Sequence, residues 1–433
     1  MKQLFSWIDK ALPLAEELET ELTKRPAVSP DSGGEGELDK CVFLEGWLRA
    51  QGITQLERFD APDSRARGGV RPNLIATILG GDASIPGDGA SIPGSAGENS
   101  GRLTSGGRLW IISHMDVVPP GEFSHWKTDP WTAVRFDDGP LGPRLVGRGV
   151  EDNQQGLTAS VLAALAFIKQ GLKPARTIKL YFAADEENGS EFGIGWLLEN
   201  HGGLFQKGDM ALIPDSGDPK GETIEIAEKN LIWARFVTRG AQAHGSRPDL
   251  GANAHLAGAD LALRLHYGLS EKFGEHDPLF EPDYSTFQPT KKEANVPNIN
   301  TIPGEDVFCM DMRVLPRYPI KTVLGEIDRI KEEVAAKHKV TIDYSLIQSN
   351  ESPPTSADAP LIRSLSAAIG EVYGVSARPI GIGGGTVAAF LRRLGIDCAV
   401  WGRIADSAHQ PNEFSLLENI IGDAKVMAAV ISC

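Results

Sequence analysis

Apolar residues along the middle of the chain follow two alternating spacings. Short apolar runs that are typical of buried strands alternate with stretches in which apolar residues recur at helical spacing. The predicted strands are 109–113, 145–146, 177–183 and 210–214, and the predicted helices are 157–170 and 195–201. Because strands that alternate with helices form parallel sheets, the pattern predicts an α/β fold in which a mainly parallel, mixed sheet is sandwiched by helices.

The pattern changes on both sides of this region. Residues 1–79 predict helices and strands at 4–22, 41–51, 53–59 and 73–79. Residues 230–346 predict a smaller α+β domain, with strands at 231–238, 307–314 and 340–346 and helices at 252–269 and 320–338. The chain then returns to a helix at 361–372, a strand at 398–401 and a terminal helix. The simplest architecture is one domain made of residues 1–229 and 348–433, with a second domain inserted at 230–347.

Residues 80–107 interrupt this pattern with glycine and serine, and the sequence Ala-Ser-Ile-Pro-Gly occurs there twice, at 83–87 and 90–94. Such a composition cannot bury a core, so we interpret the segment as a flexible loop between two strands. A lid over a functional site is the alternative interpretation.

The composition of the chain excludes some classes of protein and of binding partner. A length of 433 residues allows two or three domains. The net charge of −15 argues against nucleic acid or an anionic membrane as the main partner. The four cysteines are widely spaced, which predicts isolated thiols. Neither a secretory signal nor an apolar run of membrane-spanning length is visible in the sequence, so a cytoplasmic location is predicted.

Histidines and carboxylates follow several of the predicted strands. They occur in the motifs Ser113-His114-Met115-Asp116, Gly149-Val150-Glu151-Asp152-Asn153, Asp185-Glu186-Glu187, Pro214-Asp215 and Ala408-His409. Because the carboxyl ends of parallel strands form the active-site edge of such sheets, the acidic residues of the first four motifs are expected to meet there. Imidazole and carboxylate bind borderline divalent ions such as zinc, and two ions about 3.5–4 Å apart support hydrolysis by water. The motifs therefore predict a metal-dependent hydrolase with two divalent ions.

Two motifs allow roles to be assigned within them. In His114-Met115-Asp116, the first and third residues project from the same side of an extended segment, so Asp116 can accept the second ring N–H of His114. At residues 185–187, adjacent negative charges raise one another's pKa unless cations neutralise them. This predicts Glu187 as a metal ligand and Glu186 as the general base. A charged helix entry is the alternative for these three acids.

Each remaining motif also has a simpler interpretation. Asp152 could cap the following helix, Asp215 could belong to a turn, and His409 could be an ordinary loop histidine. Glu151 is interpreted as a solvated neighbour of Asp152. The turn Gly383-Gly384-Gly385-Thr386 could offer backbone N–H groups to a carboxylate or an oxyanion. The combination of motifs, rather than any one of them, carries the prediction.

In these motifs the chain resembles a family of co-catalytic zinc metallopeptidases that includes carboxypeptidase G, PepV-type dipeptidases, aminoacylase, acetylornithine deacetylase and succinyl-diaminopimelate desuccinylase. The most telling stretches are His114-x-Asp116-Val117-Val118-Pro119 and Gly147-Arg148-Gly149-x-x-Asp152, and the match runs from about residue 40 to the C-terminus. The resemblance implies one zinc ion bound by His114, Asp152 and Asp215 and another bound by Asp152, Glu187 and His409, with cobalt or manganese as alternative metals. It also implies that Glu186 is the general base, that Asp116 orients His114 and that the Asp152–Asn153 peptide is cis.

The resemblance extends to the inserted domain, which would be the family's lid or dimerisation domain and would form a homodimer. His244 would stabilise the tetrahedral intermediate. Asn300 and Arg313 would hold the substrate, and the arginine would grip a carboxylate with two N–H groups. Gly384, Gly385 and Thr386 complete the predicted substrate-binding residues.

Two departures from the family's pattern bear on the substrate. The fifth ligand is Asp215, as in the dipeptidases, and the glycine turn lacks the Ser-Asp-Gly-Arg continuation of the desuccinylases. The expected reaction is hydrolysis of an amide bond in a small peptide or N-acyl amino acid. A dipeptidase or carboxypeptidase is favoured over an N-acyl-amino-acid deacylase of the acetylornithine deacetylase or succinyl-diaminopimelate desuccinylase type. The complete set of ligands argues against a non-catalytic binding protein of the same fold, and the inserted domain argues against a two-zinc aminopeptidase that lacks it.

Overall fold

The computed structural model describes residues 1–81 and 107–433, and the loop predicted at 80–107 lies outside them except for its ends. Contacts between residues divide the chain into two units. The first consists of residues 1–226, 355–379 and 390–433, and the second of residues 227–354 and 380–389. The domain division predicted at 1–229, 230–347 and 348–433 stays a prediction. Residues 380–389, which it gives to the first domain, make their contacts in the second unit.

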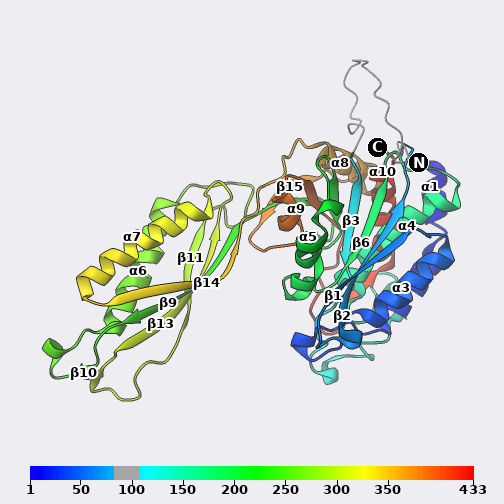
Figure 1. The fold of residues 1–433 in the computed structure, drawn as a ribbon. Coiled ribbons are helices and arrows are strands. Elements are labelled where there is room, and N and C mark those ends of the chain that lie inside the picture. The colour runs from blue at the N-terminus through cyan, green and yellow to red at the C-terminus, as the bar shows by residue number, and fades with distance from the viewer. Residues whose placement is uncertain (82–106) are drawn as a thin grey trace. The chain divides into compact units, whose positions relative to one another are not determined.

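Among the described residues, the largest sheet has eight strands, and most of its residues belong to the first unit (Figure 1). In spatial order the strands are β1 (Leu56–Pro62), β2 (Val70–Ile78), β6 (Ile178–Ala183), β3 (Leu109–His114), β7 (Met210–Ile213), β16 (Asp397–Val400), β8 (Thr223–Glu228) and β15 (Arg378–Ile382). The four central strands from β6 to β16 are parallel, whereas β1 pairs antiparallel with β2, β2 with β6, and β8 with β16. The predicted mainly parallel, mixed sheet is confirmed.

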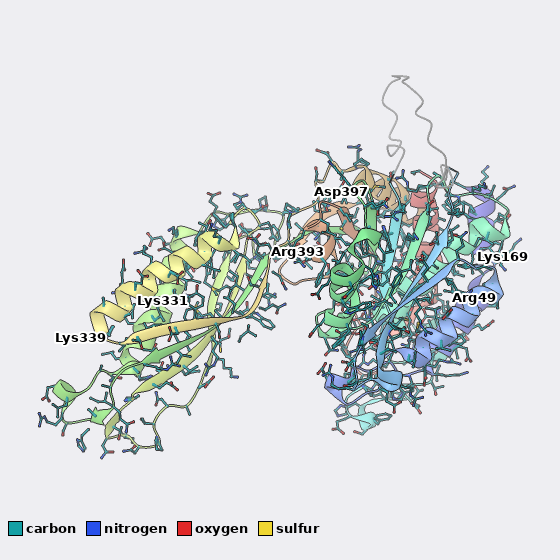
Figure 2. All side chains as sticks on the ribbon, viewed as in Figure 1. Arg49, Lys169, Lys331, Lys339, Arg393 and Asp397 are labelled. Atoms are coloured by element: carbon teal, nitrogen blue, oxygen red, sulfur yellow. The ribbon has the colours of Figure 1, made fainter. Side chains whose placement is uncertain are left out.

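Helices cover both faces of this sheet. α4 (Gly156–Lys169) lies between β3 and β6 in the chain, and α5 (Trp196–His201) lies between β6 and β7. Because β6 and β7 lie on opposite sides of β3, right-handed crossovers place α4 and α5 on opposite faces, as Figure 1 shows. α10 (Leu417–Ile431) packs on α4 and on α8 (Pro360–Tyr373), and α3 (Leu38–Gln51) packs on β2. α3 and α4 each carry a basic residue in the last turn, Arg49 and Lys169 (Figure 2), where the helix dipole favours a cation.

Burial explains why the central strands could be predicted closely. Every residue of β3 and of β7 is buried, and near-continuous apolar runs are typical of parallel strands covered on both faces. The single helix predicted at 4–22 is wrong, because the chain forms α1 (Lys2–Ile8) and α2 (Leu12–Thr23) instead. Pro13 lies at the start of α2, where a proline is tolerated, and it would have broken a continuous helix.

The first unit also contains a three-stranded sheet. It consists of β17 (Phe414–Leu416), β5 (Arg144–Val146) and β4 (Val134–Phe136), with antiparallel pairing throughout. The prediction that residues 145–146 belong to the parallel sheet is therefore wrong. The pairing of β17 with β5 brings the C-terminal segment next to the residues that lead into Asp152.

The second unit has its own core. Between residues 230 and 350, β11 (Thr286–Lys292), β13 (Glu305–Val314), β9 (Asn230–Arg239) and β14 (Thr341–Asn350) form an antiparallel sheet in that order. α6 (Ala254–Lys272) and α7 (Ile320–His338) bury their apolar sides against one face of it, where Phe236 and Phe308 stack at 5.0 Å. Lys331 lies on α7, and Lys339 ends that helix in a left-handed conformation (Figure 2). The edge strand β11 was not predicted, because most of its residues are exposed and it contains Pro289.

No helix within residues 1–81 and 107–433 is long and apolar enough to cross a membrane.

Candidate metal centre

Three neighbouring parallel strands place predicted site residues at one edge of the large sheet. β3 ends at His114, β6 ends at Ala183 just before Asp185-Glu186-Glu187, and β7 ends at Ile213 just before Pro214-Asp215. Parallel strands run in the same direction, so their carboxyl ends share an edge. His114, Glu186, Glu187 and Asp215 therefore converge although they are up to 101 residues apart in the chain.

Asp152 lies between the two histidines. Its Oδ1 atom is 3.0 Å from Nε2 of His114, and its Oδ2 atom is 3.0 Å from Nε2 of His409. Asp215 Oδ1 lies 3.2 Å from the same nitrogen of His114, and Glu187 Oε2 lies 3.1 Å from the same nitrogen of His409. The structure thus brings together all five residues that the sequence predicts as metal ligands.

The donor atoms are close enough to hold cations. His114, Glu186 and Asp215 offer three ligand atoms that lie within 4.8 Å of one another, and His114, Asp152 and Glu187 offer a second such group. Each group combines one imidazole with two carboxylates, a set that suits zinc and other borderline divalent ions. Glu186, predicted as the general base, lies within one of these groups.

The carboxylates at this edge shift the pKa values of the histidines. Burial disfavours the charged form of His114, yet the nearby carboxylates, Asp215 foremost, raise its pKa well above the ordinary value. Hydrogen bonds, the first of them with Asp152, raise the pKa of His409 to about 10. Both shifts reflect an excess of negative charge that bound divalent cations would neutralise.

Asp116 contacts the site through its backbone carbonyl group and its carboxylate. Nδ1 of His114 lies 3.0 Å from the backbone carbonyl oxygen of Asp116 and 3.4 Å from its carboxylate. The carboxylate accepts the backbone N–H groups of Glu186 and Glu187, at 3.1 and 3.0 Å. The buried Asp116 side chain therefore holds the turn that carries both glutamates, and its carbonyl group orients the His114 ring.

A buried ion pair that the sequence reasoning missed lies beneath the same turn. Arg71 on β2 donates Nε–H to Glu37 at 2.7 Å and makes a second hydrogen bond to that carboxylate through Nη2. Nη1 of Arg71 lies 3.2 Å from Asp185, and Glu37 accepts the backbone N–H of Asp185. The three side chains are at most 2% exposed. An arginine in a strand whose residues are mostly buried is the signal that could have revealed this network.

We expect Arg71→Ala to lower the free energy of unfolding by about 3–5 kcal/mol, because it leaves the Glu37 and Asp185 carboxylates buried without a cation. Urea denaturation of both proteins measures the difference. Arg67→Ala is the matched control, since Arg67 pairs with Glu35 and Asp39 but is about half exposed, and such pairs contribute less than about 1 kcal/mol. Equal losses in the two variants would contradict the expected result.

The backbone around Asp152 does not serve as a helix cap. α4 begins at Gly156, and no side chain caps its first turn. The Asp152–Asn153 peptide is cis, as the resemblance implies. Asn153 accepts the backbone N–H of His114 at 3.3 Å and donates to the carbonyl oxygen of Pro214 at 2.6 Å. These two hydrogen bonds of Asn153 connect the backbone next to Asp152 to the ends of β3 and β7. The strand predicted at 145–146 does not belong to the parallel sheet and does not provide this connection.

The interpretation of Glu151 as a solvated neighbour is wrong. Its side chain is 4% exposed, and its carboxylate accepts hydrogen bonds from Ala405 and Ser407, in the segment that leads to His409. Glu413, which the sequence reasoning missed, is fully buried and accepts hydrogen bonds from the segment that leads to Asp152. Neither glutamate stands out in the sequence, because burial depends on the contacts between distant segments.

The remaining predicted residues form two groups within the second unit. His244 is exposed and lies opposite Thr301 in the short pair of β10 (Ala243–His244) and β12 (Thr301–Ile302), so Asn300 is its close neighbour. Arg313 donates to Asp311 through Nε and Nη2 and to the carbonyl oxygen of Gly383 through Nη1.

Hydrogen bonds also hold Thr386 of the glycine turn at residues 383–386, and in one of them its hydroxyl group donates to the buried Glu228 at 2.6 Å. Gly384 and Gly385 thus lie between Gly383, whose carbonyl oxygen accepts from Arg313, and Thr386, whose hydroxyl group donates to Glu228. The roles of all these residues toward a substrate stay predictions.

The model of peptidase family M20/M25/M40 matches residues 110–432. An uncharacterised metallohydrolase of Methanocaldococcus jannaschii is 35% identical over 434 residues, which cover 96% of this chain and 98% of the relative. A succinyl-diaminopimelate desuccinylase of Xanthomonas campestris is 26% identical over 308 residues, 70% of this chain and 78% of that enzyme.

A solved structure shows the same fold. The structure of a dipeptidase from Saccharomyces cerevisiae aligns with a TM-score of 0.69 at 18% identity, covering 100% of this chain and 98% of that one. The family resemblance, inferred from the motifs around His114 and Asp152, is confirmed by the family model and by the close relative. The chain therefore belongs to peptidase family M20/M25/M40 and is a metallohydrolase.

Proposed function

We propose that this metallohydrolase cleaves an amide bond in a small peptide or an N-acyl amino acid. The observation that carries the proposal is the position of Asp152, whose two carboxylate oxygens each lie 3.0 Å from a different histidine ring. A carboxylate shared in this way can bridge two cations. His114, Asp152 and Asp215 would hold one ion, and Asp152, Glu187 and His409 would hold the other.

The chemistry is divided between the ions and the side chains. Two divalent ions, with zinc favoured and cobalt or manganese as alternatives, would polarise the amide carbonyl group and make the attacking water more acidic. Glu186 takes a proton from that water and delivers it to the leaving amine. Burial, and after it the negative charge of Asp215, raises the pKa of Glu186.

A peptidase is favoured over a deacylase within this reaction class. Asp215 stands at the fifth ligand position and the glycine turn lacks the desuccinylase continuation, and both features favour a dipeptide or the carboxyl-terminal bond of a short peptide. The likeness to a succinyl-diaminopimelate desuccinylase over 70% of this chain is the observation that supports an N-acyl-amino-acid deacylase as the second candidate.

The second unit would supply the groups that recognise the substrate. Three of the five N–H groups of Arg313 bind Asp311 and Gly383, which leaves one on Nη1 and one on Nη2 for a substrate carboxylate. His244 would support the oxyanion, Asn300 would hold the substrate beside it, and Gly384, Gly385 and Thr386 would offer polar groups from the glycine turn.

A homodimer through the second unit is the predicted assembly. Three large side chains on α6, Leu256, Leu263 and Tyr267, are 57%, 58% and 66% exposed and are spaced to share one side of the helix. The neighbouring β11 is an edge strand of the sheet. These features support pairing with a second copy, and sedimentation of the purified chain tests it. The cytoplasmic location inferred from the sequence stays a prediction.

We expect hydrolysis of dipeptides by zinc- or cobalt-loaded protein, measured across a panel of dipeptides, N-acetyl amino acids and N-succinyl amino acids. A chelator should abolish the release in every positive reaction, because the ions supply the Lewis acidity. Release from the N-acyl substrates alone would instead favour the deacylase. No hydrolysis in the whole panel by protein that binds two ions would overturn the proposed substrate class.

A further inference from the structure

Two buried glutamates connect the segments that carry Asp152 and His409. Each belongs to one of the two segments, and its carboxylate binds the backbone of the other. Glu151 comes from the Asp152 segment and binds the backbone before His409. Glu413 comes from the segment after His409 and binds the backbone around Asp152. Both lie in the first unit, and their exposed fractions are 4% and 0%.

Glu413 accepts four hydrogen bonds. Its Oε1 atom accepts the backbone N–H groups of Glu151 and Asp152, at 2.9 and 3.0 Å, and Oε2 accepts that of Gly149 at 3.0 Å. The fourth donor is Nη1 of Arg148, at 2.6 Å. A carboxylate that accepts three backbone N–H groups and one guanidinium N–H fixes the backbone from Arg148 to Asp152.

Glu151 holds the other segment in the same manner. Its carboxylate accepts the backbone N–H of Ala405 and both the backbone N–H and the hydroxyl group of Ser407. The Ser407 hydroxyl oxygen also accepts the backbone N–H of Phe414 at 2.9 Å, which closes the loop that contains His409.

The His409 loop has a further anchor at Asn412, whose side chain accepts the backbone N–H of Lys127 at 2.7 Å and donates to the carbonyl oxygen of His125 at 2.9 Å. The loop lies between β16 and β17, outside any helix or strand, and Asp406, His409 and Asn412 have positive φ angles of 62°, 63° and 63°. Left-handed conformations are uncommon for residues other than glycine, although Asp, His and Asn adopt them more readily than most residues do. The His409 side chain is 54% exposed, so packing against a core does not fix its position.

We propose that Glu151 and Glu413 are positioning residues, which set the separation of Asp152 and His409 and thereby build the second ion position. The inference rests on the ligand roles given to those two residues in the proposed function. The Glu151 carboxylate binds the backbone that leads to His409, whereas the Glu413 carboxylate binds the backbone N–H of Asp152, the residue shared by both ion positions.

The two glutamates therefore predict different patterns of metal binding. Glu151→Gln keeps the shape of the side chain but replaces one acceptor oxygen with an amide donor that faces backbone N–H groups. It should weaken the same binding step that His409→Ala abolishes, by about 10–100-fold, the range for residues that orient metal ligands. Ser407→Ala, which removes only the hydroxyl contact, should weaken that step less. Glu413→Gln should weaken both steps.

The test is a titration of each full-length variant with Co²⁺ alone, followed by calorimetry and by the absorption of bound cobalt, without substrate. Asp209→Asn is the matched control, because Asp209 is also buried and accepts backbone N–H groups, from Arg108 and Gln206, at the amino-terminal end of β7. Melting temperatures without added metal separate an effect on folding from an effect on the site. The control should lower the melting temperature and leave both binding steps unchanged.

Three other results of the titration would contradict the positioning role of the two glutamates. If His409→Ala loses one ion but Glu151→Gln and Ser407→Ala bind Co²⁺ within twofold of the unaltered protein, the positioning role is wrong and the proposed ligands stand. If the two variants weaken both steps equally, as a general loss of structure would, the positioning role is also wrong. If His409→Ala itself binds two ions, the ligand assignment fails and the inference fails with it.

Discussion

Glu186→Ala is expected to reduce turnover by at least about 100-fold, and by up to about 10,000-fold, while both ions remain bound, because general-base catalysis contributes about that much. Glu186 is half-buried at the carboxyl end of β6, and its backbone N–H donates to Asp116 at 3.1 Å. Its side chain thus faces the same edge as His114 and Asp215. Steady-state kinetics together with metal analysis after dialysis measure the two effects.

The metal analysis decides between two roles for this glutamate. Glu186 belongs to one of the groups whose donor atoms lie within 4.8 Å of one another, so it could act as a ligand rather than as a base. Loss of an ion in Glu186→Ala would support the ligand role, and activity within about tenfold of the unaltered enzyme would exclude the base. Glu191→Ala is the control, because Glu191 is an exposed acid five residues along the same segment.

His409→Ala is expected to lose one of two ions and to retain the other. Nε2 of His409 lies 3.0 Å from Asp152 and 3.1 Å from Glu187, so the alanine variant removes the only nitrogen donor among these three side chains. Residues that merely orient a ligand change metal affinity by about 10–100-fold, and removal of the ligand itself should exceed that range. Equilibrium dialysis against Zn²⁺ at known free concentrations measures both affinities.

Asp152→Asn provides the contrasting variant. Because each oxygen of Asp152 faces a different histidine, the asparagine variant should weaken both binding steps, whereas His409→Ala should weaken one. His276→Ala is the control, since His276 also pairs with a carboxylate, that of Asp283, but belongs to no predicted ligand group. Retention of both ions by His409→Ala would contradict the proposed ligand set.

The ligands at the strand ends could be predicted from the sequence. A buried parallel strand reads as an apolar run, and the direction of the chain decides which end of the strand the next residues occupy. His114, Glu187 and Asp215 each follow such a run, so their convergence required only the recognition of β3, β6 and β7. The helix α7 was predicted closely because its apolar spacing reflects the face that it buries.

Asp152 and His409 illustrate the limit of that reasoning. No central strand carries them: Asp152 follows β5 of the small sheet, and His409 lies in a loop before β17. Their meeting depends on the pairing of β17 with β5, which joins segments about 270 residues apart. Local patterns of apolar residues cannot predict the pairing of two distant strands. Only the shared motifs of the family indicated that Asp152 and His409 belong to one site.

The sequence by itself therefore determined the α/β class, the edge of the sheet that bears the chemistry, and the types of donor atom present there. Chain direction and hydrophobic spacing are local properties, and they were sufficient for these conclusions. Only the tertiary structure decided what holds the site in place: the Arg71 pair with Glu37, and the crossed carboxylates of Glu151 and Glu413. These groups act because they are buried and bind the backbone of distant segments, and both properties arise only when the chain has folded.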